Sequence, residues 1–153
     1  MISFHLELLA QTRTNFLNLI EGLSLEQICT VPEGRTNNIL WNLGHVVVTQ
    51  QILCYKLSGL PMNLPAELIE KYRKGSTGQV TATADELALL KQAALTLVEK
   101  TKMDYIEGIF KHFEEYPTSY GIKLHHIEEA LTFNNTHEGV HFGLALAIAK
   151  QLR

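Results

Sequence analysis

Apolar residues recur every three or four positions along four long stretches of this chain, which is the period of an amphipathic α-helix. The stretches cover approximately residues 2–22, 38–58, 84–103 and 124–151. In the first stretch, the predicted apolar stripe runs through Phe4, Leu8, Phe16, Leu19 and Leu23. The only β-branched cluster, Val46 to Val48, lies inside the second stretch. The pattern predicts an all-α protein without a run of strands.

Capping signals and loop residues limit these helices. Ser24 to Gln27 carries the N-cap signal of a short helical turn. Thr83 to Glu86 carries the capping-box pattern, in which the first and fourth residues satisfy each other's backbone N–H groups. A short helix is expected over 66–74. The third long helix is expected to reach at least residue 103, with a second piece up to Phe113 beyond a break near Gly108, and Pro117 to Gly121 is expected to form a loop.

Four amphipathic helices predict one domain over residues 1–153, folded as a four-helix bundle. With 46% hydrophobic and 19% charged residues, the chain has the composition of a globular protein that can bury a core. The connection between the second and third helices, at roughly 20 residues, is long for a helix bundle. It can therefore cross the bundle, and simple up-down-up-down order is not required.

Charge and cysteine content exclude several classes of function. The net charge of −3 gives no basic footprint for nucleic acid. No apolar run approaches the ~18 residues that span a bilayer, and the first residues lack the features of a signal peptide. Cys29 and Cys54 are too few for a disulfide framework, and Cys54 is expected in the core. We therefore expect a cytoplasmic protein that binds neither nucleic acid nor membrane.

The last helix carries two histidines four residues apart, in the segment His137-Glu138-Gly139-Val140-His141. Residues at this spacing lie one above the other on a helix face, about 6 Å apart at Cβ, and can share a metal ion. Asn134 lies one turn earlier on the same otherwise apolar face. Three polar positions on a core face need partners, which a metal ion or a buried hydrogen-bond network would provide.

The second helix has the same anomaly, because His45 lies in its apolar stripe between Trp41 and Val48. If the second and fourth helices face each other, His45 joins His137 and His141. Three protein ligands with an open position are typical of catalytic zinc sites. The remaining histidines lack such a pattern and are expected at the surface or at helix ends: His5, His112, His125 and His126.

The segment also matches the H-E-x-x-H pattern of zinc proteases. None of the 12 residues after His141 is His, Asp or Glu, so a third ligand downstream is missing. No sheet is predicted that could position a peptide substrate, and a peptidase is disfavoured. Glu138 could accept a hydrogen bond behind a ligand, act as the base that orients water, or be a solvated carboxylate.

Two segments, Asn38 to His45 and Phe133 to Gly143, together with the chain length and the order of helices, resemble the DinB-like superfamily over essentially the whole chain. The resemblance implies a four-helix bundle that holds a divalent metal ion, commonly nickel or zinc, through His45, His137 and His141. Relatives with known activity include thiol-dependent transferases that use mycothiol or bacillithiol, and a maleylpyruvate isomerase. Members often pair through bundle faces, so a homodimer is expected.

The first functional hypothesis is a metal-dependent enzyme that joins a low-molecular-weight thiol to a small electrophile, or hydrolyses a small molecule with an activated water. Asn134 would then hydrogen-bond the substrate, Trp41 would form a pocket wall unless it is a core residue, and Glu138 is the candidate catalytic group. The alternative is a non-catalytic bundle that acts in dimerisation, ligand sensing or stress response. An enzyme should keep a solvent-open cavity beside the histidines, whereas a structural metal site should be closed.

Overall fold

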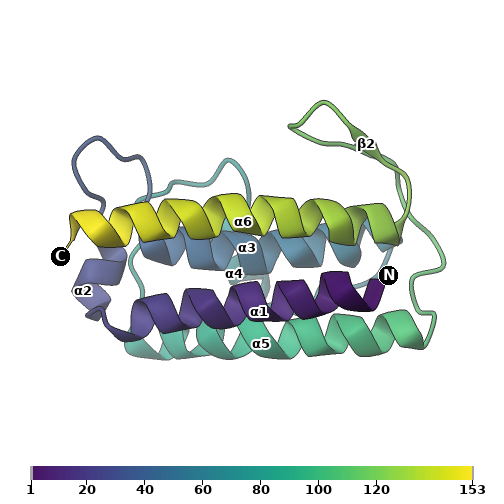
Figure 1. The fold of residues 1–153 in the computed structure, drawn as a ribbon, viewed down its shortest axis with the longest axis horizontal. Helices are drawn as coiled ribbons and strands as arrows, with labels where there is room; N and C mark the ends of the chain where they lie inside the picture. Colours follow the sequence, from purple (N-terminus) through teal and green to yellow (C-terminus); the bar gives the residue numbers. More distant parts are fainter. Residues whose placement is uncertain (1, 153) are drawn as a thin grey trace.

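Four long α-helices form most of the computed structural model, which describes residues 2–152 (Figure 1). They are α1 (Ile2–Glu21), α3 (Ile39–Cys54), α5 (Ala84–Ile106) and α6 (Ile127–Gln151). Helices α1 and α3 each contact both α5 and α6, so every long helix packs against two others. The prediction of an all-α fold is confirmed.

The two helices α3 and α5 run in the same direction, and α1 and α6 run opposite to them (Figure 1). The chain must therefore travel back along α3, which at 16 residues is about 24 Å long. The connection over 59–83 covers this distance and includes the predicted short helix, α4 (Ala66–Tyr72). The expectation that this connection crosses the protein is confirmed.

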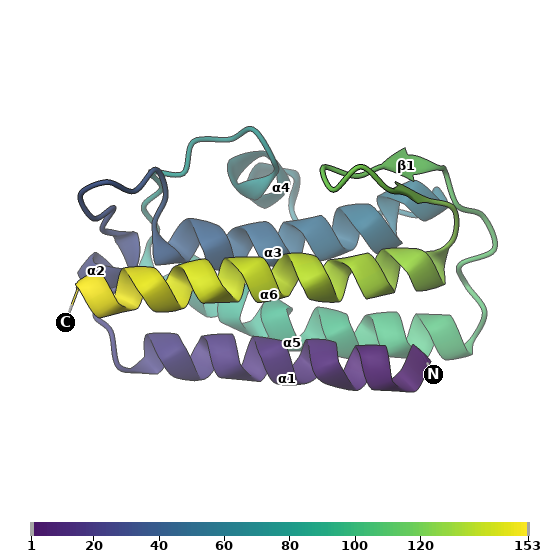
Figure 2. The ribbon, with the colours of Figure 1, turned by 45° about the horizontal axis from the view of Figure 1, so that its top comes forward.

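Shorter elements complete the fold. Helix α2 (Leu25–Cys29) follows α1, and a 3-10 helix, η1 (Lys56–Ser58), follows α3. Strands β1 (Tyr116–Pro117) and β2 (Lys123–Leu124) form a hairpin before α6. Figure 2 shows α4 and this hairpin on the same side of the long helices, opposite α1. Within residues 2–152, no helix combines the length and apolar character that a membrane span requires.

Side-chain caps fix the beginnings of α2, α3 and α5. The capping box at Ser24 is complete, because its hydroxyl accepts from the Gln27 N–H and the Gln27 side chain accepts from the Ser24 N–H. Thr83 accepts from the Glu86 N–H, but the Glu86 carboxylate accepts from other side chains instead of completing that box. Asn38 caps α3 by accepting from the Trp41 N–H, which fixes where α3 begins.

The predicted apolar face of the first helix is wrong in its first half, whereas Phe16 is buried and Leu19 packs against the core. Phe4 and Leu8 are 64% and 44% exposed. The buried face of α1 lies instead on the following residues: Leu6, Leu9, Arg13, Phe16 and Ile20. Both stripes have helical spacing, and the buried one has a charged residue at its centre. Counting apolar residues therefore favours the wrong face.

One prediction for the segment after α5 is wrong, and one is confirmed for most of its length. No second helical piece reaches Phe113, because α5 ends in a Schellman motif at Gly108, which has a φ of 68°. In this motif the Ile109 N–H donates to the Asp104 carbonyl, and the Gly108 N–H donates to the Tyr105 carbonyl. The expected loop from Pro117 to Gly121 is observed apart from Pro117, which ends β1, and it connects the two strands of the hairpin. The strand pairing itself is too short to show a sequence period.

Candidate metal centre

The structure brings three histidines together where α3 packs against α6. One ring nitrogen each from His45, His137 and His141 lies within 4.8 Å of the other two. The ring centroids are 5.1 Å apart for His45 and His137, and 4.6 Å apart for His45 and His141. The centroids of His137 and His141 are 4.5 Å apart. The convergence expected from the sequence is therefore observed.

The His45 ring is held by a backbone carbonyl. Its Nδ1 lies 2.7 Å from the carbonyl oxygen of Tyr72, at the end of α4. A carbonyl oxygen can only accept, so Nδ1 carries the proton and the lone pair of the neutral ring lies on Nε2. Histidines that bind metals commonly donate their other N–H to a carbonyl in this way.

The His141 ring is held in the same tautomer by an amide. Its Nδ1 lies 2.8 Å from Oδ1 of Asn42. The Asn42 amide cannot flip freely, because its Nδ2 donates to the Asn38 carbonyl at 2.8 Å and to Oδ1 of Asn37 at 2.9 Å. The residues that begin α3 therefore orient a histidine on α6, and they leave its Nε2 unprotonated.

The third ring, His137, has a buried Nδ1 without a hydrogen-bond partner in the described part of the chain. A buried polar atom in this state costs about 1–3 kcal/mol. Imidazole nitrogens are suitable ligands for zinc and nickel. The orphaned nitrogen and the convergent, neutral donor set therefore fit a divalent metal ion.

Burial also prepares these histidines to act as ligands. It lowers the pKa of His137 to about 3, and the nearby His141 and His45 rings add to the effect. Burial lowers the pKa of His141 to about 4, with a further contribution from His45. Burial also lowers the pKa of His45, although its hydrogen bond to the Tyr72 carbonyl opposes the shift. All three rings are neutral at pH 7, so no proton has to leave before a metal binds.

These shifts predict how the stability of the metal-free protein depends on pH. Below the ordinary histidine pKa of 6.5, the unfolded chain gains protons that the folded chain does not accept until about pH 4 to 3. The free energy of unfolding should therefore fall as pH decreases through this window. Urea unfolding of metal-free protein at several pH values measures this decrease in the free energy of unfolding. In His141→Gln the free energy of unfolding should decrease less steeply with falling pH than in His112→Gln. Equal slopes in the two variants would contradict the prediction.

Trp41 lies against the histidines. Its ring stacks on His45 with centroids 4.4 Å apart and an interplanar angle of 9°. It is also 5.9 Å from the His141 ring, and its Nε1 donates to the hydroxyl of Ser76. Trp41 is partly buried, and it forms a wall beside two of the three rings.

Gly44 allows Tyr72 to reach the position that anchors His45. A Cβ at Gly44 would overlap the buried Tyr72 ring. Gly44→Ala should destabilise the protein by about 1–3 kcal/mol, as overpacked cores do, and should weaken metal binding. In Gly143→Ala the new Cβ meets open space, so that control should gain about 0.5–1 kcal/mol. Urea unfolding and metal titration measure both; equal stabilities for the two variants would contradict the prediction.

Glu138 is only 1% exposed, so the interpretation as a solvated carboxylate is wrong. Its two oxygens each accept a 2.6 Å hydrogen bond from the fully buried Arg13. Oε1 also accepts from the Nδ2 of Asn134, which is itself fully buried. The sequence analysis missed Arg13, although its position midway between Leu9 and Phe16 on one helix face was a usable signal. These three polar residues form a network inside the core.

A small cavity of about 80 Å³ lies beside two of the histidines. Its lining consists of His45, Thr49, Ile52, Leu53, Lys74, Tyr116, Ser119, Phe133 and His137. The residues come from α3, α6, the turn after α4 and the hairpin. The lining includes none of the three residues that were expected to take part in catalysis or substrate binding, Trp41, Asn134 and Glu138.

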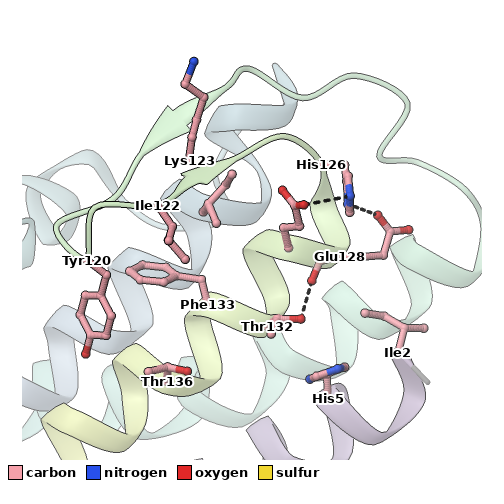
Figure 3. A pocket seen from close by; sticks show the side chains of 12 residues that line it. Ile2, His5, Tyr120, Ile122, Lys123, His126, Glu128, Thr132, Phe133 and Thr136 are labelled. Carbon is pink, nitrogen blue, oxygen red and sulfur yellow. Dashed lines mark hydrogen bonds and ion pairs between the residues drawn. The ribbon is translucent and has the colours of Figure 1, made fainter.

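A larger groove of about 610 Å³ lies on the other side of the hairpin (Figure 3). Phe133 lines both spaces and meets Tyr120 edge to face at 5.4 Å. Figure 3 shows this aromatic pair at one side of the groove, with His5 of α1 across from it and His126 beside Glu128. Phe133 and the hairpin thus separate the groove from the cavity beside the histidines.

Other chemically active side chains lie outside the cluster. His112, His125 and His126 are exposed, as expected, and His5 is partly buried at the groove. Cys54 is fully buried, as predicted, and burial raises the pKa of its thiol to about 12. It therefore cannot supply a thiolate near neutral pH.

Comparison with known families agrees with the geometry. The family model described as the DinB superfamily matches residues 8–145, which include all three clustered histidines. No curated protein matches the chain significantly. The family match covers nearly the whole chain, and the chain belongs to the DinB superfamily.

Proposed function

We propose that this protein is a metal-dependent enzyme that joins a low-molecular-weight thiol to a small electrophile. The observation that carries the proposal is the set of three neutral imidazoles, two of them fixed by their Nδ1 atoms, beside a cavity. His45, His137 and His141 would hold the ion, with nickel or zinc as the expected metal. Family membership supports a thiol of the mycothiol or bacillithiol type as co-substrate.

The arrangement supports catalysis more than a structural metal site. Structural zinc sites use four protein ligands, whereas catalytic sites keep a position for water or substrate. Three histidines converge here, and His45 and His137 both line the adjacent cavity. A divalent metal in such a site supplies Lewis acidity, which lowers the pKa of a coordinated thiol or water.

The chain itself supplies orientation and exclusion of water. Tyr72 and Asn42 hold two of the rings, and Trp41 covers one side of the cluster. During thiol transfer, the thiolate sulfur forms a bond to the electrophilic carbon, and the leaving group departs with its bonding electrons. The cavity holds the reacting groups against the histidines, a proximity that can contribute several kcal/mol to lowering the barrier.

The test uses purified protein stripped of metal and reloaded with Zn²⁺ or Ni²⁺. Chloride release from 1-chloro-2,4-dinitrobenzene is measured with bacillithiol or mycothiol. We expect turnover by the loaded protein and loss of turnover in His45→Ala and His137→Ala. The control His112→Ala removes an exposed histidine outside the cluster and should retain activity.

Elemental analysis of the same samples separates the alternatives. If the protein binds metal and consumes the electrophile without a thiol, the reaction is hydrolysis and not thiol transfer. Bound metal without either reaction would favour a non-catalytic protein used for sensing or dimerisation. Equal metal content in the wild type and the two cluster variants would refute the proposed ligand set.

A further inference from the structure

The cavity beside the histidines has one charged side chain in its lining, Lys74. His45 and His137 are neutral there because burial lowers the pKa of both rings, and the positive charge of Lys74 contributes to both shifts. The lining contains no carboxylate. The cavity therefore has a positive potential before any metal binds.

The charge of Lys74 is uncompensated, unlike that of its neighbours. Lys71 forms an ion pair with Glu86 at 2.7 Å, and Arg73 forms one with Glu70 at 2.7 Å. Among residues 2–152, no carboxylate lies within 4 Å of the Lys74 ammonium group. Of the three basic residues Lys71, Arg73 and Lys74, the one that lines the cavity is thus the one without a carboxylate partner.

The backbone around Lys74 is attached to the histidine cluster on both sides. Two residues earlier, the Tyr72 carbonyl accepts from His45, and two residues later the Ser76 hydroxyl accepts from Trp41. The Ser76 hydroxyl also donates to the Arg73 carbonyl, which closes the turn. Lys74 is itself exposed to solvent, but these contacts hold the backbone on either side of it next to the histidine cluster.

We propose that Lys74 binds a carboxylate of the substrate, so that the site selects a small thiol or electrophile with a carboxylate near its reacting atom. This inference rests on the proposed function, because it concerns the same cavity. Ser119 also lines the cavity and offers a hydroxyl donor to the same anion. The Thr49 hydroxyl, also in the lining, lies 3.4 Å from Nε2 of His45. A carboxylate is smaller than a phosphate group, which suits a cavity of about 80 Å³.

The experiment compares two thiols that differ in charge but not in length, 3-mercaptopropionate and 3-mercaptopropionamide. Each is titrated into Co²⁺-loaded protein, and binding is followed by the thiolate-to-cobalt charge-transfer absorption. We expect the wild type to bind the carboxylate about tenfold more tightly than the amide, the effect of one charged hydrogen bond. Lys74→Gln should lose this preference and keep its affinity for Co²⁺, whereas Lys74→Arg should retain the preference.

A matched control separates local binding from net charge. Lys150→Gln removes the same charge from an exposed residue that does not line the cavity, and it should keep the preference. Loss of the preference in Lys150→Gln, or its absence in the wild type, would overturn the role of Lys74 and leave the metal site intact. Failure of the wild type to bind Co²⁺ would refute the metal site itself, and this inference with it.

Discussion

Replacing Arg13 with methionine should destabilise the protein by about 3–5 kcal/mol, the usual cost of removing one member of a buried ion pair. The side chains of Arg13 and Glu138 are 0% and 1% exposed. Without the guanidinium, the Glu138 carboxylate would remain in the core with only the Asn134 amide as a partner. Urea unfolding at pH 7 measures the loss.

Two control variants isolate the ion pair. In Arg73→Met an exposed pair with Glu70 is removed, and the expected change is at most about 1 kcal/mol. The double variant Arg13→Met/Glu138→Leu removes both buried charges and should recover most of the lost stability. A loss below about 1 kcal/mol in Arg13→Met would contradict the prediction, as would a double variant no more stable than the single one.

Arg13 connects all four long helices. From α1, its guanidinium binds Glu138 of α6, the Val46 carbonyl of α3 at 3.0 Å and the Ala94 carbonyl of α5 at 3.2 Å. Glu138 directly follows His137 in the chain, and Val46 directly follows His45. The guanidinium therefore fixes the register of α3 against α6 at the level of the histidines. Arg13→Met should accordingly weaken metal binding as well as stability.

The histidine cluster could be predicted from the sequence because the relevant geometry is local. The spacing of His137 and His141 alone places both rings on one face of α6. His45 interrupts an apolar stripe on α3, and a polar residue in such a stripe requires a partner inside the protein. Once two helices each expose an imidazole to the same core, the rings converge if α3 and α6 are neighbours in a register that brings them to the same level, as they are here.

The groups that orient these histidines could not be predicted from the sequence, because they depend on packing between distant segments. Asn42 lies three residues before His45 on α3, yet its amide binds His141 on α6. The Tyr72 carbonyl belongs to the connection after α3, and a backbone carbonyl has no sequence signature. Glu138 was open to several interpretations for the same reason, since its partner Arg13 is 125 residues away.

Metal affinity should therefore depend on Asn42 as well as on the histidines. His45→Ala and His141→Ala each remove one of three donors and should abolish stoichiometric binding. Asn42→Ala leaves all three rings in place but removes the acceptor for the His141 Nδ1–H. Loss of such a supporting contact typically weakens metal binding about 10–100-fold. Competition for Zn²⁺ with a chromophoric chelator measures the affinities.

The controls distinguish orientation from folding. Asn18→Ala changes an exposed asparagine of α1, and His112→Ala an exposed histidine; both should bind Zn²⁺ like the wild type. Bound Zn²⁺ should also raise the melting temperature of every variant that retains the site, because a ligand of the folded state stabilises it. Wild-type affinity in a folded Asn42→Ala would show that the amide does not orient His141. In that case the cluster would be organised by α3–α6 packing and the Tyr72 carbonyl alone.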